Sequence, residues 1–140
     1  MKVCIVGSRS LEVDGNVALH VVTTLVQLDP SDEILVRKPL TRVLRPFEAL
    51  VASLAGTMGH TVTEYAPEPG GRAQVFLRDV EMVRDSDQVI AFFADGDEMS
   101  GGTGHVVDKA IDQKRSVRAY AVEADKLRLI AEEDWSEGTA

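Results

Sequence analysis

The sequence predicts a three-layer α/β protein in which helices cover both faces of a mainly parallel, five-stranded sheet. Short apolar runs alternate along the chain with longer segments whose apolar residues recur at helical spacing. Loops rich in glycine and proline separate these segments. The 140 residues suit a single domain with one core. We assign residues 1–123 to this domain and residues 124–140 to an acidic C-terminal extension.

Five apolar runs are too short to be helices, and they predict the strands. These runs span residues 2–6, 33–36, 60–65, 88–93 and 116–122. Strands that alternate with helices predict parallel pairing and right-handed crossovers. The carboxyl ends of the predicted strands therefore meet at one rim of the sheet.

Four longer segments predict helices at residues 16–27, 46–58, 73–84 and 103–114. The first is expected to begin with Asn16 as its N-cap. The buried stripe expected in the third consists of Phe76, Val80 and Val83. At 3.6 residues per turn, Arg78 lies on roughly the opposite side of that helix. We also expect a short helix around residues 126–132, followed by a frayed end.

The composition is 44% hydrophobic and 27% charged, which is typical of a globular domain and argues against a disordered or fibrous chain. The one cysteine, Cys4, lies in an apolar run and predicts a small core residue. Without a disulfide, a signal peptide or an apolar stretch of ~20 residues, the protein is expected in the cytoplasm and outside the membrane. The net charge of −8 disfavours general nucleic-acid binding.

Positive charge is concentrated in one short part of this acidic chain. Four basic residues share a segment that contains no acid: Arg37, Lys38, Arg42 and Arg45. The residues after Ala131, in contrast, carry four acids and no base. Such a basic segment is typical of a binding site for a small anion or for an acidic partner, and a solvated basic loop is the alternative.

Polar segments follow each of the first four predicted strands. They span residues 7–9, 37–45, 70–78 and 100–108. In open parallel sheets, ligands bind at the carboxyl ends of the strands, where the strand order reverses. The four segments therefore predict a binding site at this rim.

The segment at residues 100–108 is the strongest binding motif, because it places glycines between a strand and a helix. Glycines let backbone amides approach an anion closely, and the first helical turn adds unpaired N–H groups, each contact contributing roughly 0.3–1 kcal/mol. The candidate ligand-binding residues are Gly7, Ser8, Arg9, Gly101, Gly102, Thr103, Gly104 and His105. The alternatives are a tight strand exit at residues 7–9 and a long flexible loop before the helix.

Other kinds of site are disfavoured. The histidines His20, His60 and His105 lie far apart and lack the spacing of metal ligands, so no metal is expected. The motif G-x-x-x-x-G-K-[ST] is absent, as is G-x-G-x-x-G after the first strand, which argues against an ordinary ATPase and an NAD dehydrogenase. We therefore expect no cofactor.

One ordered set of residues resembles a known family. The set comprises Arg78, Met82, Ser86, Asp87, Ile90, Ala91, Gly101, Gly102, Gly104 and Asp108. It resembles the run R-K-x-x-M-x-x-x-S-D-x-x-I-A, followed by P-G-G-x-G-T-x-x-E, of the lonely-guy (LOG) proteins. With residues 7–9 it is similar to the wider SLOG superfamily of nucleotide-binding domains, over most of residues 1–122. The resemblance implies a Rossmann-like three-layer αβα fold.

In lonely-guy enzymes these motifs serve hydrolysis of the N-glycosidic bond of a nucleoside 5′-monophosphate. The resemblance implies that Arg78 and Asp108 are catalytic, that the glycines hold the phosphate, and that the protein is a homodimer. The chain departs from the family pattern at four positions, where lysine, proline, threonine and glutamate are replaced by Asp79, Ser100, His105 and Asp108. The basic segment at residues 37–45 also stands where the family has a glycine-rich loop.

The nucleoside 2-deoxyribosyltransferases are a rival family. Gly102, Thr103 and Ala110 fit a pattern, G-T-x-x-E-x-x-x-A, that resembles theirs. The nucleophilic glutamate of that pattern would fall at Val106. Because valine cannot form a glycosyl ester, this chemistry is disfavoured.

Two hypotheses follow from the sequence. In the favoured one, the domain binds a nucleotide or a nucleotide-derived molecule, such as a phosphoribose or ADP-ribose derivative, for sensing or sequestration. In the alternative, it is a phosphoribohydrolase that acts on a nucleoside monophosphate. We favour binding because the departures cluster at the catalytic motif, whereas the phosphate-holding glycines remain.

Overall fold

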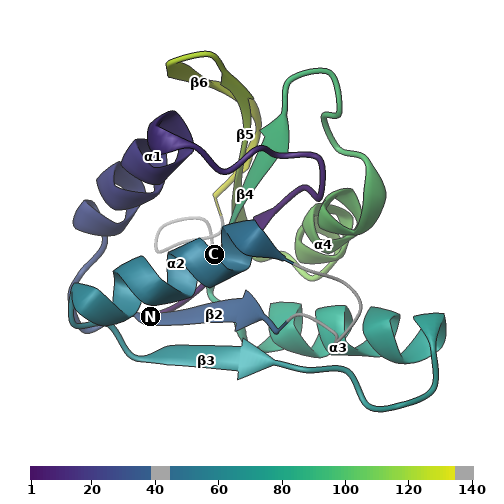
Figure 1. Cartoon of the computed structure of the whole chain (residues 1–140). Helices are drawn as coiled ribbons and strands as arrows, with labels where there is room; N and C mark the ends of the chain where they lie inside the picture. The colour runs from purple at the N-terminus through teal and green to yellow at the C-terminus, as the bar shows by residue number, and fades with distance from the viewer. Residues whose placement is uncertain (39–44, 135–140) are drawn as a thin grey trace.

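The computed structural model describes residues 1–38 and 45–134 and has a Rossmann-like α/β fold (Figure 1). The helices are α1 (Gly15–Val26), α2 (Pro46–Thr57), α3 (Arg72–Asp85) and α4 (Gly101–Asp112). The strands are β1 (Lys2–Gly7), β2 (Glu33–Arg37), β3 (Val62–Tyr65), β4 (Gln88–Ala94), β5 (Ser116–Glu123) and β6 (Lys126–Glu133). The predicted alternation of strands and helices is confirmed.

The strands form one sheet in the order β3-β2-β1-β4-β5-β6. Strands β1 to β5 pair in parallel, and β6 runs antiparallel to β5. Helices α1 and α2 cover one face of the sheet, and α3 and α4 cover the other (Figure 1). Along β1, Val3 and Ile5 face the first layer, while Cys4 and Val6 face the second. Alternation along a buried strand thus supplies both cores.

The predicted short helix around residues 126–132 is wrong, because these residues form the sixth strand. Ala124 and Asp125 make a two-residue turn, in which Ala124 has a positive φ of 45°. Strand β6 then pairs back onto β5, with Val122 opposite Leu127 and Tyr120 opposite Leu129. The tight turn lets the eight residues of β6 satisfy their backbone groups against β5 rather than within a helical turn.

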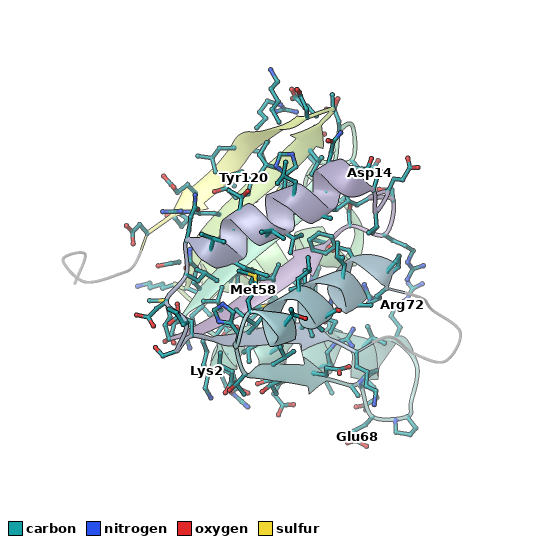
Figure 2. The ribbon with its side chains drawn as sticks, turned by 60° about the vertical axis from the view of Figure 1, so that its left-hand side comes forward. Lys2, Asp14, Met58, Glu68, Arg72 and Tyr120 are labelled. Atoms are coloured by element: carbon teal, nitrogen blue, oxygen red, sulfur yellow. The ribbon has the colours of Figure 1, made fainter. Side chains whose placement is uncertain are left out.

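The N-cap of α1 is Asp14 and not the predicted Asn16. The Asp14 carboxylate accepts a hydrogen bond from the backbone N–H of Val17 at 2.9 Å, which pairs one of the free amides of the first turn. Figure 2 shows Asp14 at the start of the helix. The apolar residues Val17, Val21 and Leu25 lie on one face of the helix and are all buried.

The buried face of α3 differs from the predicted stripe. Phe76 is 40% exposed, while Arg78 and Asp79 are buried. Arg78 Nε donates to Asp79 Oδ1 at 2.7 Å, and its Nη1 donates to the Tyr65 carbonyl oxygen at 3.1 Å. These partners satisfy two charged side chains in the interior. Apolar periodicity could not reveal this arrangement, because the helix turns a charged pair inward.

The structure bears on two expectations, that Cys4 is a core residue and that no helix spans a membrane. Cys4 is fully buried, and this burial raises the pKa of its thiol to about 12. The thiol therefore stays protonated at neutral pH, which suits a structural core residue. Within the part of the chain that the structure describes, no helix combines the length and the hydropathy needed to cross a membrane.

The end of β1 packs tightly against α2. A Cβ added to Gly7 would lie 2.3 Å from Cδ1 of Phe47, a buried ring at the start of that helix. No side chain fits this contact without moving the ring. The glycine therefore allows α2 to approach the carboxyl end of the central strand.

We expect Gly7→Ala to destabilise the protein by about 1–3 kcal/mol, because the added methyl group overpacks the Phe47 contact. Urea unfolding followed by circular dichroism measures this change. Gly15→Ala is the matched control, since a Cβ at Gly15 meets nothing within 4 Å. Equal free energies of unfolding for the two variants would contradict the prediction.

Candidate functional site

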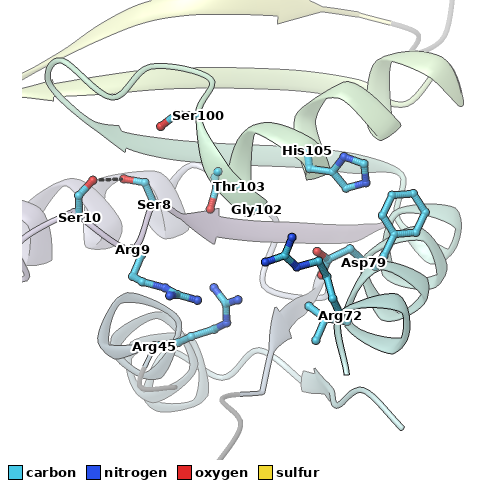
Figure 3. Close-up of a pocket in the computed structure, with 13 residues that line it drawn as sticks. Ser8, Arg9, Ser10, Arg45, Arg72, Asp79, Ser100, Gly102, Thr103 and His105 are labelled. Carbon is cyan, nitrogen blue, oxygen red and sulfur yellow. Dashed lines mark hydrogen bonds between the residues drawn. The ribbon is translucent and has the colours of Figure 1, made fainter. Parts of the chain in front are cut away.

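The main cavity has a volume of about 810 Å³ and lies at the carboxyl end of β1 (Figure 3). This volume falls within the ~300–1,000 Å³ range of small-molecule sites. Each of the four predicted polar segments contributes to its wall. The lining residues are Ser8, Arg9, Ser10, Arg45, Arg72, Val75, Phe76, Asp79, Ser100, Gly101, Gly102, Thr103 and His105.

Sheet topology explains the position of the cavity. The chain proceeds outward from β1 through β2 to β3 on one side and through β4 to β5 on the other, so the strand order reverses between β1 and β4. The loops after these two strands diverge there and leave a crevice. At the base of the crevice, Ser8 links the end of β1 to β4. Its N–H donates to the Phe92 carbonyl oxygen at 2.9 Å, and its Oγ accepts from the Ala94 N–H at 3.0 Å.

Three arginines point into the cavity from different elements (Figure 3). Arg9 follows β1, Arg45 precedes α2 and Arg72 opens α3. Among the residues that the structure describes, no carboxylate lies within ion-pair distance of these three guanidinium groups. Burial, together with the nearby charge of Arg37, lowers the pKa of Arg45 to about 10, so this side chain is still cationic at neutral pH. The cavity therefore carries unneutralised positive charge.

The N-terminus of α4 faces the same cavity. No side chain caps this helix, because the Ser100 hydroxyl donates instead to the Asp97 carbonyl oxygen at 2.6 Å. The first N–H groups of a helix have no intrahelical partner and carry the positive end of the helix dipole. Gly101, Gly102 and Thr103 of this turn line the cavity. Such an uncapped turn is suited to an anion.

The candidate glycines divide into two kinds. Gly101 has a positive φ of 64°, and Gly102 has only Arg37 near its missing Cβ, so these two leave the cavity wall open. Gly104 instead packs against the chain, because a Cβ there would lie 2.0 Å from the Met99 carbonyl oxygen. Gly7 packs against Phe47 and likewise does not line the cavity.

A buried ion pair lies beneath the cavity. The Arg37 side chain is 0% exposed, and its Nε donates to Glu48 Oε1 at 3.0 Å. Its Nη2 donates to the Gly7 carbonyl oxygen at 3.0 Å and to Thr103 Oγ1 at 2.9 Å. Thr103 Oγ1 in turn donates to the Gly7 carbonyl oxygen at 2.8 Å. One guanidinium thus joins β1, β2, α2 and α4.

The basic segment predicted to bind an anion is split by the structure. Arg45 lines the cavity, Arg37 is enclosed with Glu48, and Lys38 is exposed outside the lining. Arg42 lies outside the described residues. No sequence signal pointed to Glu48, because a glutamate in the first turn of a helix is ordinarily solvated.

The two predicted catalytic residues are not brought together. Asp108 is exposed on α4 and does not line the cavity. Arg78 is buried, with its guanidinium engaged by Asp79 and by the Tyr65 carbonyl oxygen. The carboxylate that lines the cavity is Asp79, which sequence reasoning recorded only as a departure from the family pattern.

One end of the cavity is apolar and aromatic. The rings of Phe76 and His105 have centroids 4.4 Å apart and are tilted by 42°. Val75 lines the wall beside them, and His105 Nε2 is a buried nitrogen without a hydrogen-bond partner in the structure. Figure 3 places His105 across the cavity from Arg9. A flat ring with polar edges fits this end.

The remaining observations limit the class of site. Among the described residues, no group of three or more His, Cys, Asp and Glu side chains could hold a metal ion. No protein-family model matches the chain, and no curated protein or solved structure matches it either. The sheet order defines a Rossmann-like α/β fold, and a proposal about function rests on the geometry of this cavity.

We expect Glu48→Ala to destabilise the protein by about 3–5 kcal/mol, because it leaves the buried Arg37 guanidinium without its counter-charge. The free energy of unfolding in urea measures the loss. Glu64→Ala, at an exposed glutamate of β3, is the control. The double variant Arg37→Met/Glu48→Leu should recover most of the stability, and a loss below ~1 kcal/mol in the single variant would contradict this account.

Proposed function

We propose that the protein binds a nucleotide or a nucleotide-derived small molecule in this cavity, for sensing or sequestration. The observation that carries the proposal is that Arg9, Arg45 and Arg72 line one cavity together with the uncapped first turn of α4. Charged donors without counter-charges gain most from an anionic ligand, because hydrogen bonds between ionised groups are about twice as strong as neutral ones.

The aromatic end supports a nucleotide over inorganic phosphate alone. A ligand held only by its phosphate would leave the Phe76 and His105 rings and the unpartnered His105 Nε2 unused. A base lying against these rings would cover the half-exposed Phe76 and accept or donate a hydrogen bond at that nitrogen. Phosphate and base therefore suit opposite ends of one cavity.

The geometry favours binding over hydrolysis by a phosphoribohydrolase. Hydrolysis of an N-glycosidic bond needs a carboxylate beside the sugar to steer water or stabilise the developing cation. Asp108 lies outside the cavity, and Asp79, which lines it, is occupied by Arg78 at 2.7 Å. The resemblance to SLOG domains and the homodimer that it implies are part of the same proposal.

We expect isothermal titration calorimetry to show binding of adenine, guanine, cytosine or uracil nucleotides, with the matching nucleoside bound at least about 10-fold more weakly. Arg45→Ala should weaken the bound nucleotide by about 10-fold or more, because hydrogen bonds to charged groups contribute about 1.5–3 kcal/mol. Arg84→Ala is the control, since Arg84 pairs with Asp85 outside the cavity.

Chromatography of the same mixtures tests the alternative. We expect no free base to be released. Release that Asp108→Ala abolishes would refute a purely binding role, and the absence of binding by any nucleotide would refute the proposed function.

A further inference from the structure

The positive charge of the cavity is divided into two groups. Arg9 and Arg45 approach each other at one end, and Arg72 reaches in from the opposite wall (Figure 3). Arg72 lies one helical turn before Phe76, and therefore on the side of the aromatic end. A ligand that extends from the aromatic end therefore meets the guanidinium of Arg72 first and those of Arg9 and Arg45 beyond it.

The acid in the cavity does not cancel this charge. Asp79 is already paired with the buried Arg78. Beneath Gly102, the Nη1 of Arg37 is a buried donor that has no hydrogen-bond partner among the described residues, and it lies 3.7 Å from the position that a Cβ on Gly102 would take. Glu48 binds the other side of that guanidinium. The free charge therefore amounts to three guanidinium groups, supported by the α4 dipole and the unused Arg37 donor.

We propose, on the basis of the function proposed above, that the ligand is a nucleoside 5′-diphosphate with a free terminal phosphate. A terminal phosphate carries about −1.5 to −2 charge at neutral pH, which matches the pair Arg9 and Arg45. The inner phosphate carries a single charge and matches Arg72 and the first turn of α4. A nucleoside monophosphate lacks the outer phosphate, and a diphosphate-linked sugar such as ADP-ribose has both phosphates but lacks the terminal dianion.

The cavity volume is consistent with a ligand of this length. At about 810 Å³ it lies in the upper part of the ~300–1,000 Å³ range of small-molecule sites. The aromatic rings and the arginine pair stand at opposite ends, so the ligand spans the cavity with both ends held. Arg9 and Arg45 are on this account the residues that determine specificity for the second phosphate.

The test compares the Kd values of ADP, AMP and ADP-ribose, or the corresponding nucleotides of the preferred base, by calorimetry in EDTA. We expect wild-type protein to bind the diphosphate at least about 10-fold more tightly than either of the other two. Arg9→Ala should reduce this preference to less than about threefold, because it weakens the diphosphate more than the monophosphate. Arg72→Ala should weaken the monophosphate and the diphosphate by similar factors.

Several outcomes separate this inference from the function on which it rests. Equal binding of diphosphate and monophosphate, or tighter binding of ADP-ribose, overturns the inference and leaves nucleotide binding intact. Loss of the preference in Arg84→Ala, which removes the same charge outside the cavity, also overturns it. Binding of none of the ligands overturns the proposed function. Arg9 is exposed, so its variant should keep the wild-type Tm, and Arg45→Ala repeats the measurement from a second element.

Discussion

The buried ion pair of Arg37 and Glu48 holds together the elements that build the cavity. Its hydrogen bonds reach the end of β1, the start of α2 and the first turn of α4, so all three walls share one charged group. Removing these charges from water is costly and is offset only if nearly every donor and acceptor is paired. The pair therefore constrains the positions of Gly7 and Thr103, and it lies beneath the cavity that Arg9, Arg45 and Arg72 line.

Much of the fold could be predicted, because alternation of strands and helices depends on local apolar periodicity. The sixth strand could not, since its pairing depends on a two-residue turn at Ala124 and on β5 rather than on its own pattern. At the candidate site, the carboxyl ends of the predicted strands indicated the rim of the sheet at which the cavity lies. They could not distinguish Arg37 from Arg45, because the acid that encloses Arg37 lies 11 residues away and Thr103 lies 66 residues away.

The pair Arg78 and Asp79 includes the arginine for which the resemblance implied a catalytic role. In the family pattern that the sequence resembles, the residue after the arginine is a lysine. Here the aspartate at that position takes the guanidinium at 2.7 Å, and both side chains are buried beside the end of β3. A group held in this way supports packing between α3 and the sheet. In the proposed function, recognition of the ligand falls to Arg9, Arg45 and Arg72.

The protein places a positive cavity in a chain with a net charge of −8. The net negative charge repels an approaching anion, and this repulsion is largely screened beyond a Debye length of about 8 Å at physiological salt. Near the cavity, the arginines attract the anion instead. Added salt therefore weakens the repulsion by the acidic surface, and it also weakens the contacts between the arginines and the anion. If the cavity binds an anion as proposed, encounter rate and equilibrium affinity should respond to ionic strength in opposite directions, and a long polyanion would meet more of the repelling acidic surface than a small anion does.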